Sequence, residues 1–342
     1  MEWDVFSHHK FPVRRDDQVG ELRRLIRSRL QQLGFSEKHI ACADLVATEM
    51  ANNLLRHTPK GGEVLFCGRT RMHQPQFEMI SLDKGPGIAN IIRAMQDGFS
   101  TAGGPGIGLG TMQRNADEFE MFSRPGSGTA ILIRMWEAAY HSETADKQEF
   151  SIGGIAVPAA GETLCGDGWH YHDQAGELTV AVVDGLGHGE KACEAAWSAL
   201  KAFDQMREAP LPDMMRAMNR ACRSTRGAAA FIARISTVTH TLQFTGIGNI
   251  SACVVSPDGT KKGLPSMNGI LGAFEAPFTV HALPWQDRNY LVLHSDGILN
   301  RWKGKVMLQR PRELTLKAAI LYRDYCKGYD DATMVIAQVR RG

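Results

Sequence analysis

Two different patterns of apolar and polar residues divide the chain. In the first part, apolar residues recur at helical spacing: Leu22, Leu25, Ile26, Leu30 and Leu33. Gly34 is a stop signal after this helix, and Ser36, a suitable N-cap residue, begins a second predicted helix that runs to about His57. Strands are predicted at 63–70, 76–83, 118–124 and 128–136, with shorter helices at 89–98 and 108–117. Helices followed by mixed strands indicate an α+β fold class.

The second part of the chain is rich in strands. Apolar runs bounded by turn residues predict strands at 150–159, 178–184, 229–236, 241–248, 251–259, 278–284, 289–296 and 333–340, and helices at roughly 190–207 and 211–223. Between the two parts, the stretch AAYHSETADKQ is polar and has no strong period. Because 342 residues exceed one ordinary core, we predict domains at 1–138 and 150–342, joined by a linker at 139–149.

Composition limits the classes of function. The net charge is only +2 and neither part is basic, which argues against nucleic acid as a partner. The N-terminus lacks a basic-then-apolar signal pattern and no 18-residue apolar run occurs, so we expect a cytoplasmic protein without a membrane partner. The seven cysteines are scattered singly, which argues against a disulfide framework and a zinc ribbon.

A polar stripe on the second predicted helix is the first candidate for chemistry. Glu49, Asn53 and His57 lie at i, i+4 and i+8, so they share one helix face. A carboxylate stacked above a carboxamide can hold a metal ion or activate a water molecule. Taken alone, the three residues are more typical of an ordinary polar helix face.

Glycine-rich segments follow this stripe. Asp83 ends an apolar strand, and Gly85 and Gly87 come directly after it. The segment STAGGPGIGLG then carries five glycines ahead of a predicted helix: Gly103, Gly104, Gly106, Gly108 and Gly110. Exposed backbone amides that lead into a helix suit phosphate, although glycines also mark plain turns. The segment is neither a Walker loop, because no GK[ST] follows, nor a dinucleotide fingerprint, because no strand leads directly into it.

In this order, E-x-x-x-N, D-x-G-P-G, the glycine-rich segment and GSGTA resemble the motifs of the GHKL ATPase superfamily over nearly all of 16–136. The resemblance implies an α/β sandwich that binds ATP. It implies that Asp83 accepts a hydrogen bond from the adenine amino group, Asn53 holds Mg²⁺ and Glu49 is the general base. The other implied ATP contacts are Gly85, Gly87, the five glycines of 103–110 and Thr129. Within the superfamily, the text is most similar to the small RsbT-like serine kinases of bacterial stress modules.

Aspartates at the ends of apolar strands form the second candidate site. They are Asp167 in CGDGW, Asp184 before Gly185, Asp296 after YLVLHS, and Asp330 and Asp331 before ATMVIAQV. Asp-Gly is a favoured turn pair, so each one alone is typical of an ordinary turn. Several such sites in one β-rich domain can converge at one end of a sandwich, where hard carboxylate oxygens bind Mg²⁺ or Mn²⁺.

The ordered set GD, VVDGLGHG, HSDGI and DDAT resembles the metal-dependent protein phosphatases (PPM), and more narrowly their SpoIIE/RsbX-type branch, over about 150–340. The resemblance implies an αββα β-sandwich in which two cations activate a water molecule for attack on a phosphoryl group. It implies that Asp184 bridges the two metals, with the Gly185 carbonyl on one of them. Asp296 and Asp330 would complete the other metal, and Asp167 would act mainly through metal-bound water. The sequence leaves open whether Asp330 or Asp331 is the ligand.

Two further residues near these motifs bear on the chemistry. His188 suggests a general acid, but we expect a hydrogen-bonding role, because the metals already supply the base. The stretch IGGIAVPAAGETLCGD has no arginine for substrate phosphate, a group found in other branches of the family. Arg226 is a candidate substitute, although an ordinary surface arginine is the simpler interpretation.

The two resemblances together predict a fusion of an RsbT-like kinase with a PPM serine/threonine phosphatase. They imply ATP, Mg²⁺ and Mn²⁺ as cofactors and a STAS-domain protein as the substrate, with a sigma factor or another signalling protein as a further partner. The alternative is that the first domain only binds ATP or a partner protein and regulates the phosphatase.

Overall fold

The computed structural model describes residues 7–71, 74–96, 107–137, 149–273, 277–309 and 311–340. Its contacts divide the chain into two units, His8–Ser142 on the one hand and Met1–Ser7 with Glu143–Gly342 on the other. Gly103, Gly104, Gly106 and most of the predicted linker lie outside the described residues. The exact domain boundaries therefore stay a prediction.

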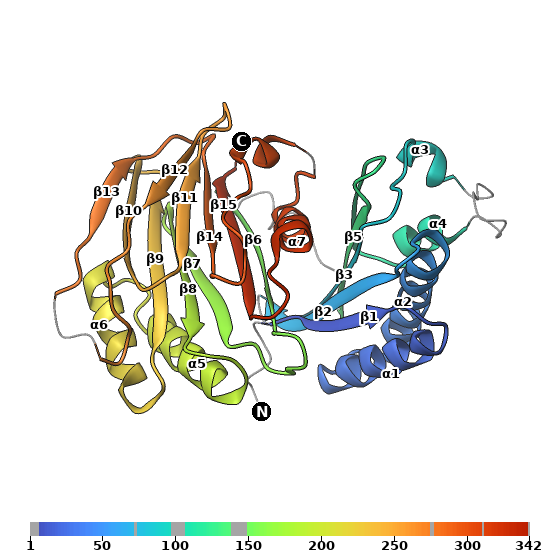
Figure 1. The fold of residues 1–342 in the computed structure, drawn as a ribbon, viewed down its shortest axis with the longest axis horizontal. Helices are drawn as coiled ribbons and strands as arrows, with labels where there is room; N and C mark the ends of the chain where they lie inside the picture. The colour runs from blue at the N-terminus through green and yellow to red at the C-terminus, as the bar shows by residue number, and fades with distance from the viewer. Residues whose placement is uncertain are drawn as a thin grey trace. The chain divides into compact units, whose positions relative to one another are not determined.

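The first unit is an antiparallel sheet with helices on one face (Figure 1). Its strands are β1 (His9–Val13), β2 (Gly62–Arg71), β3 (Gln74–Asp83), β4 (Glu118–Ser123) and β5 (Thr129–Trp136), in the order β1-β2-β3-β5-β4. Its helices are α1 (Asp17–Gln32), α2 (Glu37–His57), α3 (Ile91–Ala94) and α4 (Gly108–Arg114). The apolar faces of α1 and α2 pack on the sheet and form the core of the unit.

Most elements expected in the first unit are present. Gly34 follows α1 with a φ of +79°, a conformation that glycine adopts without strain, and Ser36 occupies the N-cap position of α2. Within the described part of the helix expected at 89–98, α3 covers only Ile91–Ala94 and has no buried residue to extend its packing; residues 97 and 98 lie outside the described residues. Strand β1 was not expected, because its sequence, HKFPV, is short, half polar and contains proline.

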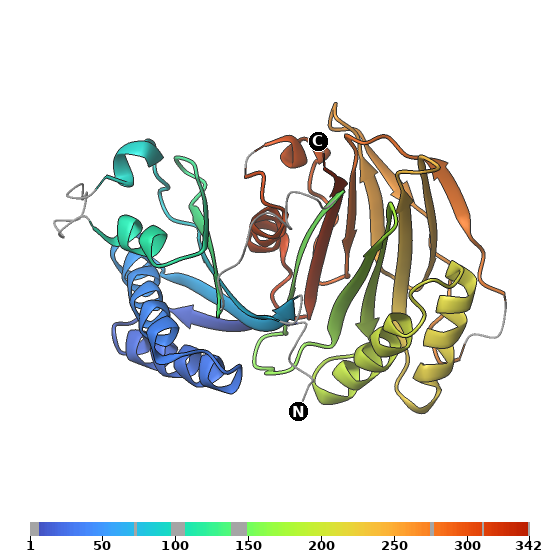
Figure 2. The same cartoon turned by 180° about the vertical axis from the view of Figure 1, so that it is seen from behind.

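The second unit is a sandwich of two five-stranded sheets (Figure 2). One sheet has the order β13-β10-β9-β8-β7 and the other β12-β11-β14-β15-β6. The bounds are β6 (Phe150–Val157), β7 (Asp167–Gln174), β8 (Glu177–Gly185), β9 (Ala228–Ser236), β10 (Thr241–Ile247), β11 (Ser251–Val255), β12 (Lys261–Leu264), β13 (His281–Pro284), β14 (Tyr290–His294) and β15 (Ala332–Val339). Helices α5 (Glu190–Asp204) and α6 (Leu211–Ala221) pack on the first sheet, and α7 (Leu314–Tyr325) packs on β6 and β15. The αββα sandwich is thus confirmed.

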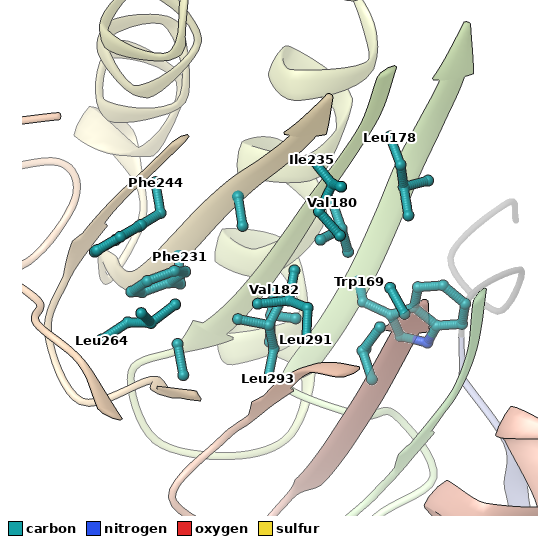
Figure 3. Close-up of a cluster of buried hydrophobic side chains, with 14 of the residues drawn as sticks. Trp169, Leu178, Val180, Val182, Phe231, Ile235, Phe244, Leu264, Leu291 and Leu293 are labelled. Atoms are coloured by element: carbon teal, nitrogen blue, oxygen red, sulfur yellow. The ribbon is translucent and has the colours of Figure 1, made fainter. Parts of the chain in front are cut away.

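Strand β8 shows why its sequence is continuously apolar. Leu178, Val180 and Val182 point between the sheets, where Figure 3 shows the labelled side chains of the core gathered together. Ala181 and Val183 point to the opposite face, where α5 and α6 cover them. Because side chains alternate along a strand, a strand buried on both faces needs apolar residues at successive positions.

Strands β7 and β12 and helix α7 were not expected from the sequence. Helix α7 is buried from Leu314 to Arg323, including the polar Lys317, so it lacks the amphipathic period that identifies a surface helix. It lies close to β6, because a Cβ at Gly153 would be 2.3 Å from the backbone nitrogen of Thr315. Strand β13 begins at His281, later than the expected 278.

Candidate functional site

A cavity of about 550 Å³ lies in the first unit. Its walls include the predicted residues Glu49, Asn53, His57, Asp83, Gly87, Gly108 and Thr129. Gly85 and Gly110 do not line it. The stripe on α2, the end of β3, the start of α4 and the start of β5 therefore meet at one place, and the volume lies within the usual range for a small-molecule site.

The chain around Asp83 is arranged by close backbone contacts. The N–H of Gly85 donates to Asp83 Oδ1 over 2.7 Å, which fixes the carboxylate at the end of β3. Gly128 approaches the same residue so closely that a Cβ would lie 2.1 Å from the Asp83 carbonyl oxygen. Gly87 has a φ of +71°, and its Cβ would lie 1.8 Å from the carbonyl oxygen of Arg124. Gly87 and Gly128 thus allow the segment after β3 to lie directly against the turn between β4 and β5.

Hydroxyl groups extend this arrangement. The N–H of Ile88 donates to Ser123 Oγ over 2.8 Å, and Ser123 Oγ lies 2.9 Å from Thr129 Oγ1. Thr129 is therefore held by a hydroxyl pair at the cavity wall. Ser123 was missed from the sequence, since only the β4–β5 pairing brings it opposite Thr129.

Glu49 and Asn53 lie together where α4 begins. A Cβ at Gly108 would be 2.5 Å from Glu49 Oε2 and 3.7 Å from Asn53 Oδ1. The carboxylate and the amide oxygen thus face the same short stretch of backbone, one helical turn apart. The sequence also gave no signal for other polar residues of the wall: Asn52, Arg56, Asn90 and Arg93.

The aspartates of the second unit converge at one end of the sandwich. Asp167 begins β7 and lies directly opposite Asp184 at the end of β8. Asp296 follows β14, and Asp330 and Asp331 precede β15, the neighbour of β14 in the second sheet. The predicted strand-end carboxylates from both sheets therefore belong to one cluster.

The electrostatics of this cluster reflect the mutual approach of its carboxylates. Burial, followed by the charge of Asp184, raises the pKa of Asp167 well above its usual value. Burial, followed by the charges of Asp296 and Asp330, raises the pKa of Asp184 to about 7. The pKa of Asp331 is also raised, mainly by burial. Carboxylates that repel one another in this way are stabilised by cations.

The ligand-type atoms of the cluster also fit divalent cations. Asp167 is only 5% exposed, and its Oδ2 has no hydrogen-bond partner. Asp296 receives a hydrogen bond of 2.8 Å from Asn249 Nδ2 and lies 3.5 Å from Lys327 Nζ, which orient it from the side. A set of hard oxygen atoms with an unsatisfied buried member is the donor set that Mg²⁺ and Mn²⁺ prefer.

Asp330 and Asp331 have different surroundings. One oxygen of Asp331 accepts the backbone N–H of Ala159 over 2.8 Å, so it helps to hold the chain after β6. The pKa of Asp330 is raised by burial and then by a hydrogen bond with Asp296 and its charge, which places the two side chains together. The contacts of Asp330 are thus directed to the cluster and those of Asp331 partly to the backbone.

The loop that follows Asp184 depends on its glycines. A Cβ at Gly185 would lie 2.0 Å from the carbonyl oxygen of Ala192, so the loop turns tightly into α5. His188 is exposed and its Nδ1 lies 2.7 Å from Glu162 Oε1. Arg226 Nη1 lies 3.1 Å from where a Cβ of Gly187 would be, so this exposed cation is beside the loop.

Comparison with known proteins matches a different family to each unit. The family described as "Histidine kinase-like ATPase domain" matches residues 11–136, and "Stage II sporulation protein E (SpoIIE)" matches residues 174–340. The first unit is therefore a histidine kinase-like ATPase domain, and the second is a SpoIIE-type PPM phosphatase domain. More narrowly, the chain belongs to the partner-switching regulators, with an RsbT-like kinase domain followed by an RsbX/SpoIIE-type phosphatase domain.

Two curated relatives match the two parts separately. The chain is 36% identical over 139 residues to the serine/threonine-protein kinase RsbT of Bacillus subtilis strain 168, which is 40% of this chain and 90% of that protein. It is 25% identical over 138 residues to the phosphoserine phosphatase RsbX of the same organism, which is 40% of this chain and 69% of that protein.

Solved structures show the same phosphatase fold. A chain described under "The bacterial stressosome: a modular system that has been adapted to control secondary messenger signaling" has a TM-score of 0.53 and 25% identity, and the match covers 55% of this chain and 99% of that chain. RsbX in complex with magnesium has a TM-score of 0.51 and 20% identity over 56% of this chain and 96% of that chain. Among the residues that the structure describes, no helix is long and apolar enough to cross a membrane.

Proposed function

We propose that this chain both removes phosphate from, and transfers phosphate to, serine or threonine of a STAS-domain protein. The observation that carries the proposal is the presence of two polar constellations in one chain. One is the carboxylate cluster around Asp184, and the other is the cavity in which Glu49, Asn53 and Asp83 meet. The similarity to a kinase and to a phosphoserine phosphatase supports opposite reactions on related substrates.

In the phosphatase unit, we assign Asp184, the Gly185 carbonyl, Asp296 and Asp330 as the residues that hold Mg²⁺ or Mn²⁺, with Asp167 acting through water. When bound, such ions neutralise the phosphoryl oxygens and lower the pKa of a water molecule. The carboxylates would hold these ions at the end of the sandwich where the cluster lies. Asp331 supports them by accepting a hydrogen bond from the backbone N–H of Ala159.

Arg226 beside the loop is suited to orient the phosphate of the substrate. Its guanidinium group is exposed, and it lies next to Gly187 of the loop that carries Asp184. A guanidinium can donate two parallel hydrogen bonds to phosphate oxygens. His188 serves as a hydrogen-bond partner of Glu162 and keeps the loop in place.

In the first unit, we assign Asp83 as the acceptor for the adenine amino group, with Gly85, Gly87 and Thr129 around it. We likewise assign the glycines of 103–110 to the ATP phosphates, as the resemblance implies, and Asn53 to Mg²⁺. Glu49 is the general base. A serine hydroxyl oxygen forms a bond to the γ-phosphorus, the bond to the ADP oxygen breaks, and the hydroxyl proton passes to the Glu49 carboxylate.

The variant Glu49→Gln tests the kinase half of the proposal. It keeps the size of the side chain and removes the base. We expect it to bind ATP with unchanged affinity and to lose transfer of labelled phosphate to a STAS-domain protein by at least about 100-fold, the scale of general-base catalysis. Dephosphorylation of pre-phosphorylated substrate is expected to continue at the wild-type rate.

Glu37→Gln is the matched control, because it makes the same change at the exposed start of the same helix. It should behave as wild type in all three assays. If Glu49→Gln transfers phosphate as fast as wild type, or if wild type phosphorylates no STAS-domain protein, the first unit is instead an ATP- or partner-binding module that regulates the phosphatase.

A further inference from the structure

A cluster of metal-ligand side chains lies outside both sites already described. It consists of His170 and His172 of β7 and Asp204, the last residue of α5. One ligand atom from each residue lies within 4.8 Å of the other two. The two histidines are two residues apart on one strand, so they point to the same face of the sheet. On this face α5 packs, and the ring of His172 stacks on Phe203 at 4.5 Å between centroids.

The distances in this cluster match the coordination shell of a zinc ion. His170 Nε2 lies 3.0 Å from Asp204 Oδ1, and His172 Nδ1 lies 3.9 Å from the same oxygen. Ligands about 2.05 Å from a tetrahedral zinc are about 3.3 Å apart. The observed separations lie on either side of that value. Small side-chain rotations would therefore complete a two-histidine, one-carboxylate set.

The protonation of His172 also suits a ligand. Its Nε2 lies 3.4 Å from the carbonyl oxygen of Phe203, which can only accept a hydrogen bond, so this nitrogen carries the hydrogen. The lone pair of Nδ1 is then directed at the Asp204 carboxylate. Metal-bound histidines typically donate their other ring N–H to a carbonyl in this way.

One positive charge competes for the site. Arg207 Nη2 lies 3.0 Å from Asp204 Oδ1, but the arginine is 56% exposed and sits on the same turn of chain. An exposed pair of this kind is weak, so a divalent cation can displace it. Asp204 is itself 41% exposed, which leaves room for water as a fourth ligand.

A second cluster of the same kind has a different character. His8, Cys67 and Glu78 also bring their ligand atoms within 4.8 Å of one another. However, Glu78 is bonded to Arg69 over 2.8 Å and to Arg134 over 2.6 Å. Because the buried Arg134 and the partly buried Arg69 both contact its only carboxylate, that cluster is a structural ion-pair network and is unsuited to a cation.

We propose that His170, His172 and Asp204 form a zinc site that fastens the C-terminal end of α5 to strand β7. Imidazole and carboxylate donors in a four-coordinate arrangement are typical of Zn²⁺. The site is separate from the aspartate cluster, which lies at the start of β7 and before α5 begins. The bound ion would stabilise the packing of α5 on the sheet and take no part in phosphate chemistry.

The test uses the full chain without an affinity tag, freed of metal and then loaded with excess Mg²⁺ to occupy the aspartate cluster. Zn²⁺ alone is the probe, and calorimetric titration measures its affinity and stoichiometry. We expect one zinc per chain beyond any that displaces magnesium. His170→Asn should weaken this binding by more than about 100-fold, the upper end of what loss of an outer-shell partner costs. His240→Asn, the same change at an exposed turn outside the cluster, should leave it unchanged.

Two further measurements separate a zinc site from a merely structural cluster. Arg207→Ala removes the competing cation and should tighten zinc binding about two- to fivefold. At zinc concentrations about 100 times the Kd, the melting temperature of the wild-type phosphatase unit should rise by about 5 to 10 °C, and that of His170→Asn should not. If wild type and His170→Asn bind zinc equally, or if Arg207→Ala weakens binding, the proposal is wrong.

Discussion

Removal of divalent metal should make the stability of the phosphatase unit fall as the pH rises from about 5 to 8. The pKa of Asp184 is raised from 3.8 to about 7 by burial and by the neighbouring carboxylates. In the unfolded chain the same carboxyl has an ordinary pKa near 4. Between about pH 4 and 7, the folded state therefore holds a proton that the unfolded chain has lost. Stability decreases with rising pH through this window and levels off above it.

The size of this effect follows from the shift. A pKa difference of about three units corresponds to about 4 kcal/mol, at about 1.36 kcal/mol per unit. Asp167, Asp330 and Asp331 are shifted in the same direction, and such carboxylates titrate as a coupled group. For a domain of about 190 residues, each kcal/mol changes the melting temperature by roughly 2 to 4 °C. About two of these three units are lost between pH 5 and pH 7, which corresponds to about 2.7 kcal/mol. We therefore expect a drop of about 5 to 11 °C between pH 5 and pH 8 in EDTA.

Calorimetry of the full chain at several pH values, with EDTA or with Mg²⁺, measures this drop. Bound Mg²⁺ replaces the protons, so the decline should largely disappear in its presence. Asp184→Asn stays neutral at every pH, and in EDTA it should melt above wild type at pH 8 and close to it at pH 5. The first unit is identical in both chains, so their difference isolates the cluster. A melting temperature in EDTA that is constant, or higher at pH 8 than at pH 5, would refute the reasoning.

Three more outcomes test the first unit. Gly87→Ala should lower its stability by more than about 1 kcal/mol in urea denaturation, because of its positive φ and the 1.8 Å approach to Arg124; equal midpoints would contradict this. Asp83→Asn should weaken ATP binding about 10- to 100-fold in calorimetric titration, because a charged hydrogen-bond acceptor is lost; unchanged affinity would exclude an adenine contact. Glu78→Gln should cost about 3 to 5 kcal/mol in urea denaturation, because it leaves Arg134 buried beside a neutral amide; a loss below about 1 kcal/mol would show that the ion pair is dispensable.

The sequence was most informative where a candidate site residue lies at the end of a predicted strand or in the period of a predicted helix. Asp184 could be identified because a strand apolar at successive positions stops at a carboxylate and a glycine, and burial on both faces explains that run. Asp83 ends β3 in the same way. Helix α2 could be predicted because its apolar residues recur on one face, and the same period places Glu49 one turn before Asn53. These signals need only the local chain.

The sequence predicted that the strand-end aspartates converge, but it could not predict which strands pair and in which register. The register that sets Asp167 opposite Asp184 depends on which strands are neighbours, and strand β7 itself was missed. Its sequence, DGWHYHDQ, looks polar because only alternate residues, Trp169 and Tyr171, point to the core. Ser123 was missed for the same reason, since it gains its partner Thr129 only across β4 and β5.

Strand β7 was missed because its side chains alternate between the core and the opposite face, and the same alternation places its two histidines on the opposite face. The positions that alternate with Trp169 and Tyr171 are His170 and His172, and they face α5. On the same face of the sheet, strand β8 carries the apolar Ala181 and Val183. His170 and His172 instead meet Asp204, the residue at which α5 ends. Neutral imidazoles at a layer boundary cost desolvation that an apolar pair would not. In the proposed site, a bound zinc ion would offset this cost by taking up the lone pairs of the two imidazoles. The zinc titrations of wild type and His170→Asn test whether zinc binds there.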